Sequence, residues 1–302
     1  MKIKLIANPV AGRHAAGKIR EIERLLTSLG AKVDVALTEY AGHAEVLARD
    51  CRGFDRLVAA GGDGTVNEVI NGMMPRPVPL AVIPLGTANI LALETGLPTD
   101  LVGQCENAVR GGVRQVTLGR AGGRYFLLMA GAGLDAEVVR GVNLRAKRWL
   151  GKGAYLLSAL RVFFHPPAAV ALTSADWRMS GLGGVIVCNG RMYGGGFVLA
   201  PQASLFSPTL QVIALPRRSP FGWFRFAIRG LLRGGLESDV KIFAAASIEV
   251  SGEAAMQLDG DTAGELPCKI TSCPAALPLV IGDRGHVSNS VGAGFKPARK
   301  DK

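Results

Sequence analysis

Short apolar runs alternate with segments of helical periodicity over the first third of the chain. The strand-like runs are Ile3–Ala7, "KVDVAL", "RLVAAG" and "PLAVIPLG". Helical patterns follow them over residues 19–29, Ala44–Arg49, Thr65–Asn71 and Ala88–Thr95. A repeated order of strand, turn and helix predicts an α/β fold with a doubly wound parallel sheet. Such sheets bind ligands outside the carboxyl ends of their strands.

After Gly111 the pattern changes to short strands separated by turn residues, among them "VRQVTLG", "RYFLLMAG", "AAVALTS", "GGVIVCNG", "PCKIT" and "LPLVIG". This spacing predicts a second, antiparallel β-sandwich or barrel-like domain, interrupted by helical inserts at Asn143–Phe164 and Phe221–Arg233. We therefore expect an α/β domain over residues 1–122 and a β-rich domain over residues 123–283. A basic, disordered tail is expected over residues 284–302.

Composition narrows the class of protein. Hydrophobic residues make up 48% of the 302 residues and charged residues 20%, as in globular proteins. A net charge of +11 points to polyanionic partners such as nucleotides, nucleic acid or an anionic membrane face. Five cysteines without a CxxC pair argue against disulfides and zinc, and no apolar run is long enough for a spanning helix. These features predict a cytosolic protein.

The stretch Leu57–Gly72, "LVAAGGDGTVNEVING", places one carboxylate inside a glycine-rich turn between a strand and a helix. Glycines at 61, 62 and 64 let backbone N–H groups approach a phosphate, and the helix N-terminus adds partial positive charge. A bare carboxylate would repel phosphate unless a cation lies between them. Asp63 is therefore either a Mg²⁺-linked or hydrogen-bond-organising group, or an ordinary helix N-cap.

Two further turns follow strands of the same predicted sheet. "NPVAGRHAAGK" follows the first strand and carries Asn8, Gly12, Arg13 and Lys18. "PLGTANILA" follows the fourth strand and carries Gly86, Thr87 and Asn89. The carboxyl ends of parallel strands meet at one edge, so the three turns together predict a phosphate-binding site.

The motifs "NPVAG", "TEYAGHA", "GGDGTVNEVING", "PLGTANILA", "AGAGLDAEVV", "GGGFVLAPQAS" and "LDGD" occur in this order. In this the chain resembles the diacylglycerol kinase/sphingosine kinase superfamily, and most of all the bacterial lipid kinases with a diacylglycerol kinase catalytic domain. The resemblance covers residues 1 to about 282. NAD kinases and phosphofructokinases also carry "GGDGT", but "NPVAG" and the β-rich second half favour the lipid kinases.

The resemblance implies a kinase that binds ATP and Mg²⁺ between a nucleotide-binding and a lipid-binding domain. It implies ATP contacts from Asn8, Pro9, Gly12, Arg13, Thr38, Gly61, Gly62, Asp63, Gly64, Thr65, Asn67, Glu68, Gly86, Thr87 and Asn89. Asp63 would organise the phosphates and Mg²⁺. Asp261 of "LDGD" stands where the family has a catalytic Glu, with Asp259 beside it, and would take the proton of a lipid hydroxyl. Read alone, "LDGD" is a hairpin turn.

Two positions depart from the family pattern. Ile90 stands where many relatives have Asp, which weakens the case for diacylglycerol as the substrate. The loop "ASLFSPTLQV" corresponds to one that binds a structural Mg²⁺ in bacterial diacylglycerol kinases. By position its ligands would be Ser204, Ser207 and Thr209, yet the loop has no carboxylate. In the relatives, acidic residues around this loop support the structural Mg²⁺. Of these acids, Asp135 in "GAGLDAE" is the one that remains in this chain.

Both predicted helical inserts mix basic residues with aromatic ones, a composition that suits the interface of an anionic membrane or a solvated helix face. With a lipid substrate we expect a cytoplasmic enzyme, peripheral at the inner membrane face. Alternatives are a kinase of NAD or a soluble polyol and a non-catalytic nucleotide- or lipid-binding regulator. The positive charge would also suit nucleic-acid binding, but the sequence contains no recognised nucleic-acid-binding module, so we expect no nucleic-acid partner. The oligomeric state is left open, with a homodimer among the options.

Overall fold

A computed structural model of the protein describes residues 1–12, 14–140, 168–174, 177–193, 197–219 and 240–282. Its N-terminal half is built on four parallel strands in the order β4–β3–β1–β2. Their bounds are β1 (Lys2–Ala7), β2 (Lys32–Leu37), β3 (Arg56–Gly61) and β4 (Leu80–Pro84). The two central strands, β1 and β3, are almost wholly buried because helices cover both faces of the sheet.

The helices of this half are α1 (Ala15–Ser28), α2 (His43–Ala48), α3 (Asp63–Met73), α4 (Ile90–Thr95) and α5 (Leu101–Arg110). Successive side chains of β1 point to opposite faces of the sheet, which shows which helices cover each face. Ile3 and Leu5 pack in one core cluster with α1 and α5, and Ile6 packs in another with α2 and α3. The predicted doubly wound parallel sheet is confirmed.

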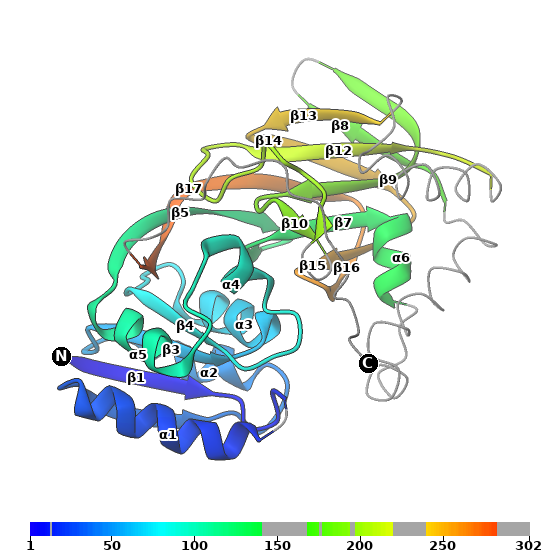
Figure 1. Cartoon of the computed structure of the whole chain (residues 1–302). Coiled ribbons are helices and arrows are strands. Elements are labelled where there is room, and N and C mark those ends of the chain that lie inside the picture. Colours follow the sequence, from blue (N-terminus) through cyan, green and yellow to red (C-terminus); the bar gives the residue numbers. More distant parts are fainter. Residues whose placement is uncertain (13, 141–167, 175–176, 194–196, 220–239, 283–302) are drawn as a thin grey trace, which may run out of the picture.

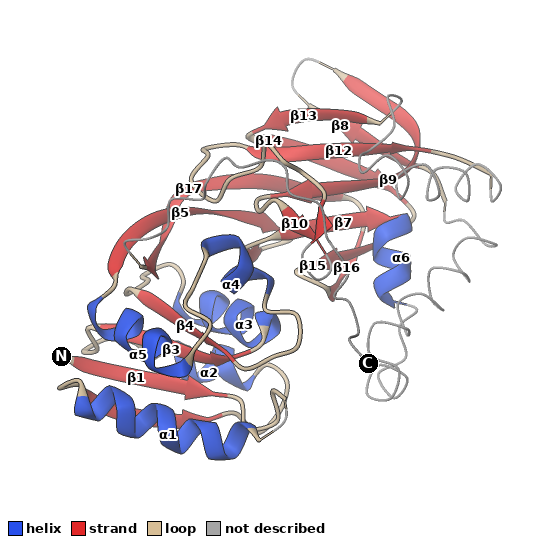
Figure 2. Ribbon diagram, viewed as in Figure 1, coloured by secondary structure: helices blue, strands red, loops and turns tan. Residues whose placement is uncertain are grey.

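In the second half the described residues are mostly in strands, as Figure 2 shows, and they include one helix, α6 (Leu134–Arg140). Its strands are β5 (Gly112–Ala121), β6 (Arg124–Phe126), β7 (Met129–Gly133), β8 (Val170–Thr173), β9 (Arg178–Cys188), β10 (Met192–Tyr193), β11 (Phe197–Val198), β12 (Leu210–Pro216), β13 (Lys241–Ala245), β14 (Ser247–Gly252), β15 (Ala255–Leu258), β16 (Asp261–Glu265) and β17 (Cys268–Ile281). All pairings among these strands are antiparallel, as predicted.

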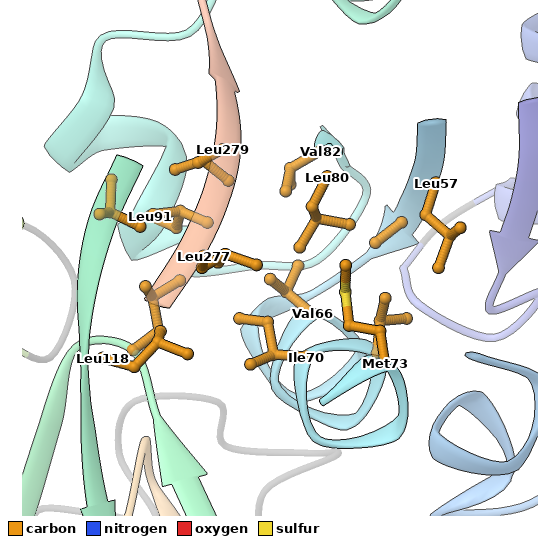
Figure 3. Packing of buried hydrophobic residues seen from close by; sticks show 14 of the residues in the cluster. Leu57, Val66, Ile70, Met73, Leu80, Val82, Leu91, Leu118, Leu277 and Leu279 are labelled. Carbon is orange, nitrogen blue, oxygen red and sulfur yellow. The ribbon is translucent and has the colours of Figure 1, made fainter. Parts of the chain in front are cut away.

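Strands β5 and β17 join the two halves (Figure 1). They pair along most of their length, and Leu279 of β17 also lies parallel to Leu80 of β4. One buried cluster therefore spans the junction: Leu118 and Leu277 pack with Val66 and Ile70 of α3 (Figure 3). The predicted boundary between residues 122 and 123 falls in the turn of the β5–β6 hairpin.

Local structure differs from the sequence prediction at several places. "PCKIT" and "LPLVIG" are one strand, β17, which absorbs Pro274 through a register shift at residues 273–277. "RYFLLMAG" is two strands, β6 and β7. Helix α4 begins at Ile90 rather than Ala88 because Asn89 is left-handed (φ 47°). Helices α5 and α6 had no predicted counterpart.

The predicted inserts at Asn143–Phe164 and Phe221–Arg233 and the tail at 284–302 lie outside the described residues. None of the described helices is both long enough and apolar enough to cross a membrane.

Candidate active site

The glycine-rich turn between β3 and α3 packs directly against the turn between β4 and α4. A Cβ added to Gly86 would lie 2.7 Å from the Cα of Gly62, so only glycine at 86 allows this approach. A Cβ at Gly61 would lie 2.6 Å from the side chain of Thr65. Two of the three predicted phosphate-facing turns are therefore in backbone contact at one edge of the sheet.

Asp63 lies on the first turn of α3, but it caps a different helix. Its Oδ2 accepts a hydrogen bond from the Ile90 amide (3.1 Å) and its Oδ1 accepts one from the Leu91 amide (3.2 Å). These amides open α4, whose own N-cap residue, Asn89, makes no side-chain cap. Asp63 is half-buried and is not the cap of α3, so it has the hydrogen-bond-organising geometry rather than that of an ordinary N-cap.

Glu68 has the same relation to α2. Its two carboxylate oxygens accept hydrogen bonds from the amides of Gly42 (2.8 Å) and Ala44 (3.1 Å), at the start of that helix. Thr38, before this turn, is buried and its amide bonds the Ala7 carbonyl. Both Glu68 oxygens thus hold the "TEYAGHA" turn, and the nucleotide contact expected of Glu68 stays a prediction.

The first turn, after β1, is held to the other two by Asn8 and Gly12. The Asn8 side chain donates to Thr65 Oγ1 (3.3 Å) and accepts from the Val10 amide (3.0 Å). Gly12 has φ 118°, and a Cβ there would lie 2.4 Å from the Leu85 carbonyl oxygen. Pro9 lies between them, half-buried. Arg13 lies outside the described residues.

Thr87 and Asn89 complete the edge. Thr87 is exposed to solvent. The Asn89 amide nitrogen donates to the Gly86 carbonyl (2.7 Å), while its Oδ1 is buried and finds no hydrogen-bond partner among the described residues. An unsatisfied acceptor beside a cradle of glycines is a place where a ligand's donor or a cation fits.

Asp261 reaches this edge from the second half of the chain. Asp259 (φ 49°) and Gly260 (φ 89°) form the two-residue turn between β15 and β16, so the predicted hairpin is present. Asp261 follows it and is exposed, and its Oδ2 lies 3.5 Å from the place of a Cβ on Gly64. The turn thus delivers a carboxylate to the mouth of the glycine-rich loop.

Asp259 points the other way, into the protein. It accepts hydrogen bonds from the amides of Leu127, Leu128 and Met129 and from Asn67 Nδ2, at 2.7–2.9 Å. Burial raises the pKa of the Asp259 carboxyl, and the four hydrogen bonds oppose that rise. This binding is why "RYFLLMAG" breaks into two strands: the amides of residues 127–129 turn toward Asp259.

The loop with Ser204, Ser207 and Thr209 lies on β5 and β17. The Ser207 carbonyl accepts from Thr117 Oγ1 (2.6 Å), and the Ser204 carbonyl accepts from the Ser207 amide (2.9 Å). The hydroxyls of Ser207 and Thr209 bond each other (3.1 Å). No group of three or more His, Cys, Asp or Glu that could hold a metal occurs among the described residues. The loop offers carbonyl and hydroxyl oxygens but no carboxylate, and the metal assignment stays a prediction.

Sequence reasoning missed two buried polar clusters. Glu94 of α4 accepts from Arg191 Nε (3.0 Å) and the Met192 amide (3.1 Å). Asp135 accepts from Tyr193 Oη and from Gln257 Nε2 (2.7 Å). Burial raises the pKa of the Asp135 carboxyl, again against its hydrogen bonds. Charged residues in otherwise apolar segments were the available signal, but their partners lie far away in the chain.

Comparison with known proteins agrees with this architecture. The family model "Diacylglycerol kinase catalytic domain" matches residues 2–121, and "YegS C-terminal NAD kinase beta sandwich-like domain" matches residues 129–281. The chain therefore belongs to the bacterial lipid kinase family of diacylglycerol kinase and YegS-like proteins. The resemblance stated from the motifs is confirmed.

Individual relatives cover nearly the whole chain. It is 29% identical over 292 residues to the diacylglycerol kinase of Bacillus subtilis (strain 168), covering 93% of this chain and 96% of that protein. It is 31% identical over 277 residues to "Probable lipid kinase YegS-like" of Pseudomonas putida, covering 88% and 89%. The crystal structure of a diacylglycerol kinase from Bacillus anthracis superposes with a TM-score of 0.77 at 26% identity, covering 93% and 97%.

Proposed function

We propose that this member of the family is an ATP-dependent lipid kinase that transfers the γ-phosphate of ATP to a lipid hydroxyl of the diacylglycerol or sphingoid type. The observation that carries the proposal is the meeting of Asp261 with Gly64. A carboxylate from the β-rich half stands at the N-terminus of α3, where the fold favours phosphate. That is the juxtaposition that phosphoryl transfer to a hydroxyl needs.

ATP would bind along the edge formed by the three turns. Backbone amides at Gly62 and Gly64 and the amide end of α3 would face its phosphates. Asn8, Pro9, Gly12, Thr38, Thr65, Gly86 and Thr87 line or support the same edge. Asp63 acts indirectly in this arrangement, by fixing the start of α4 and with it the turn that bears Thr87.

The residues present also fit Mg²⁺. Asp261 and the unsatisfied Asn89 Oδ1 are oxygen ligands of the kind that this ion prefers, and they would help to hold it. Asp63, whose two oxygens accept from the Ile90 and Leu91 amides, would organise this end of the site through α4. When bound, Mg²⁺ neutralises charge that develops on the β- and γ-phosphate oxygens.

Asp261 would act as the general base. Its carboxylate takes the proton of the lipid hydroxyl, whose oxygen forms a bond to the γ-phosphorus as the bond from that phosphorus to the β–γ bridging oxygen breaks. ADP leaves with the electron pair, and the lipid phosphate is the second product. Asp is one methylene shorter than the family's Glu, and the exposed position of Asp261 leaves room for the acceptor or one water to span the difference.

The lipid would be met at the cytoplasmic face of an anionic membrane. The chain's net charge of +11 and the basic, aromatic segments at 143–164 and 221–233 support this, although both segments lie outside the described residues. Each cation near such a surface contributes about 1 kcal/mol.

Incubation of the protein with Mg²⁺, radiolabelled ATP and vesicles of diacylglycerol, sphingoid base or monoacylglycerol tests the proposal. We expect label in a chromatographically separated lipid phosphate from at least one of these three lipids. The same incubation is repeated with NAD or a soluble polyol in place of the vesicles. Label in one of these, and in no lipid, would assign the protein to a soluble-substrate kinase. ATP binding without transfer to any acceptor would leave a nucleotide-binding regulator.

A further inference from the structure

The side chain of Asn67 is committed to the second half of the chain. Its two N–H groups donate to the Tyr125 carbonyl (3.1 Å) and to Asp259 Oδ2 (2.7 Å), and its Oδ1 accepts from Asn71 (3.1 Å). The resemblance implies that Asn67 contacts ATP. In the fold no N–H of its amide is left for a nucleotide, because both already donate to protein oxygens.

Asp259 is held as firmly from its own side. Three consecutive backbone amides, at residues 127–129, and Asn67 all donate to one carboxylate. Hydrogen bonds to an ionised acceptor are shorter and stronger than those between neutral groups, and the observed distances of 2.7–2.9 Å agree. Asp259 therefore ties α3, the β6–β7 break and the β15–β16 turn into one unit.

The turn itself leaves Asp261 little freedom. The Asp259 amide donates to the Met129 carbonyl (2.9 Å), and the Gly260 amide donates to Gln257 Oε1 (2.8 Å). Both flanks of the turn are thus bonded to the β-rich half. The hydrogen bond from Asn67 to Asp259 links this turn to α3 at a second point, beside the approach of Asp261 to Gly64.

Helix geometry connects this link with the site. Gly64 and Asn67 are three residues apart on α3, so they lie on one face of the helix. Asp261 meets that face at Gly64, and Asp259 meets it at Asn67. One helix face therefore receives both acids of "LDGD", one for chemistry and one for attachment.

We propose that Asn67 and Asp259 are positioning residues that hold Asp261 against the glycine-rich loop, and that Asn67 is not an ATP ligand. The role rests on the proposed kinase function of Asp261. Asn67 acts through the turn and touches neither nucleotide nor lipid.

Asn67→Ala tests the role, with Asn71→Ala as its matched control. Asn71 lies one turn further along α3 and bonds the amide and carbonyl of Tyr125 and the Oδ1 of Asn67, but it does not bond Asp259. Asn71→Ala therefore removes neighbouring hydrogen bonds and keeps the donation of Asn67 to Asp259. For Asn67→Ala we expect kcat to fall about tenfold or more while the Kd for ATP changes by less than about twofold. Asn71→Ala should lower the unfolding midpoint yet keep kcat within about threefold.

A double-mutant cycle with Asp261→Asn separates positioning from general damage. If Asn67 acts through Asp261, Asn67→Ala costs little further kcat once Asp261 is Asn. Additive losses, or equal losses of kcat in Asn67→Ala and Asn71→Ala, would overturn the proposal. An ATP Kd weakened about tenfold in Asn67→Ala would make Asn67 a ligand.

Amide hydrogen exchange gives a readout that does not depend on turnover. Asn67→Ala should accelerate exchange in the segment 255–265, and Asn71→Ala should leave it near the wild-type rate. If the wild type transfers no phosphate to lipid, the proposed function fails. Hydrogen exchange still shows whether Asn67 holds the β15–β16 turn against α3. Unchanged exchange in Asn67→Ala would overturn the positioning role whatever the activity.

Discussion

At the scale of single residues, two carboxylates of α3 bind the opening amides of neighbouring helices. Asp63 bonds those of α4, and Glu68 bonds those at the start of α2. In a glycine-rich loop, where the backbone is otherwise free to adopt many conformations, such bonds reduce the number of arrangements that the loop can take. Asp63 is therefore half-buried and structural as well as close to the site.

Replacing Asp63 by Ala should lower both stability and turnover. The amides of Ile90 and Leu91 lose their acceptor, which costs about 0.5–2 kcal/mol, the range for loss of a helix cap. Urea unfolding of wild type and variant measures the loss, and the lipid-kinase assay follows turnover. Asp63→Asn keeps one acceptor oxygen, so its unfolding free energy should lie between those of wild type and Asp63→Ala. Unaltered stability in Asp63→Ala would show that α4 does not depend on this cap.

Asp261→Asn removes a proton acceptor and keeps the shape of the side chain. Turnover should fall by roughly 10²–10⁴, the usual contribution of a general base, while the Kd for ATP stays nearly unchanged. Asp261→Glu restores the family's residue and should retain or raise activity. Steady-state kinetics and calorimetric ATP binding give the two quantities. Near-normal turnover in Asp261→Asn would reduce "LDGD" to a turn.

At the scale of elements, the loop Ala203–Thr209 is held by hydrogen bonds to the strands beneath it. Thr117 bonds the Leu205 and Ser207 carbonyls through its amide and hydroxyl, and Ser272 bonds the Pro208 carbonyl. Arg114 adds a cation–π contact over Phe206, 3.6 Å from the ring centre. Of the three predicted metal ligands in this loop, Ser207 is the one whose carbonyl these contacts engage.

Thr117→Val should therefore destabilise the protein in a way that Mg²⁺ does not repair. The variant keeps the shape of a buried side chain but leaves the Ser207 carbonyl without its donor, a loss of about 1–3 kcal/mol. Thermal unfolding without nucleotide, with Mg²⁺ or with a chelator, is the measurement. A Mg²⁺-dependent rise in midpoint that Ser207→Ala abolishes would instead place a metal in the loop.

At the scale of the whole molecule, buried polar groups connect elements that are far apart in the sequence. Asp135 at the start of α6 binds Tyr193 of β10 and Gln257 of β15, and Gln257 continues to the amide of Gly260. Glu94 joins α4 to Arg191 and to Met192, the first residue of β10. Polar partners therefore run from the turn that carries Asp261 to the helix that Asp63 caps.

The raised pKa of Asp135 sets the sign of a pH effect. As pH rises above about 4, the unfolded chain releases this proton before the folded protein does, so wild type loses stability until the folded pKa is passed. Asp135→Asn lacks this titration. We expect the unfolding free energy of the variant, minus that of wild type, to increase over this window and then stay constant. Urea unfolding at several pH values measures the difference, and a difference that falls with pH would contradict the raised pKa.

Local sequence was enough to predict the N-terminal layers, the antiparallel second half and the edge at which three turns meet. Periodicity and glycine placement reflect burial and backbone conformation, which neighbouring residues largely determine. The hairpin at Asp259–Gly260 was predictable for the same reason, since two residues with positive φ form its turn. The family followed from the order of motifs.

Tertiary structure alone decided which group each polar side chain meets. Asp63 selects α4 instead of its own helix, Asn67 selects Asp259 instead of solvent, and "PCKIT" merges with "LPLVIG" because both pair with β5. These partners are distant in the chain. One backbone amide looks like any other in the sequence, so the sequence does not indicate which of them a given carboxylate will bind. Only packing brings a particular donor within hydrogen-bond distance of a particular acceptor and removes the water that would otherwise compete for it.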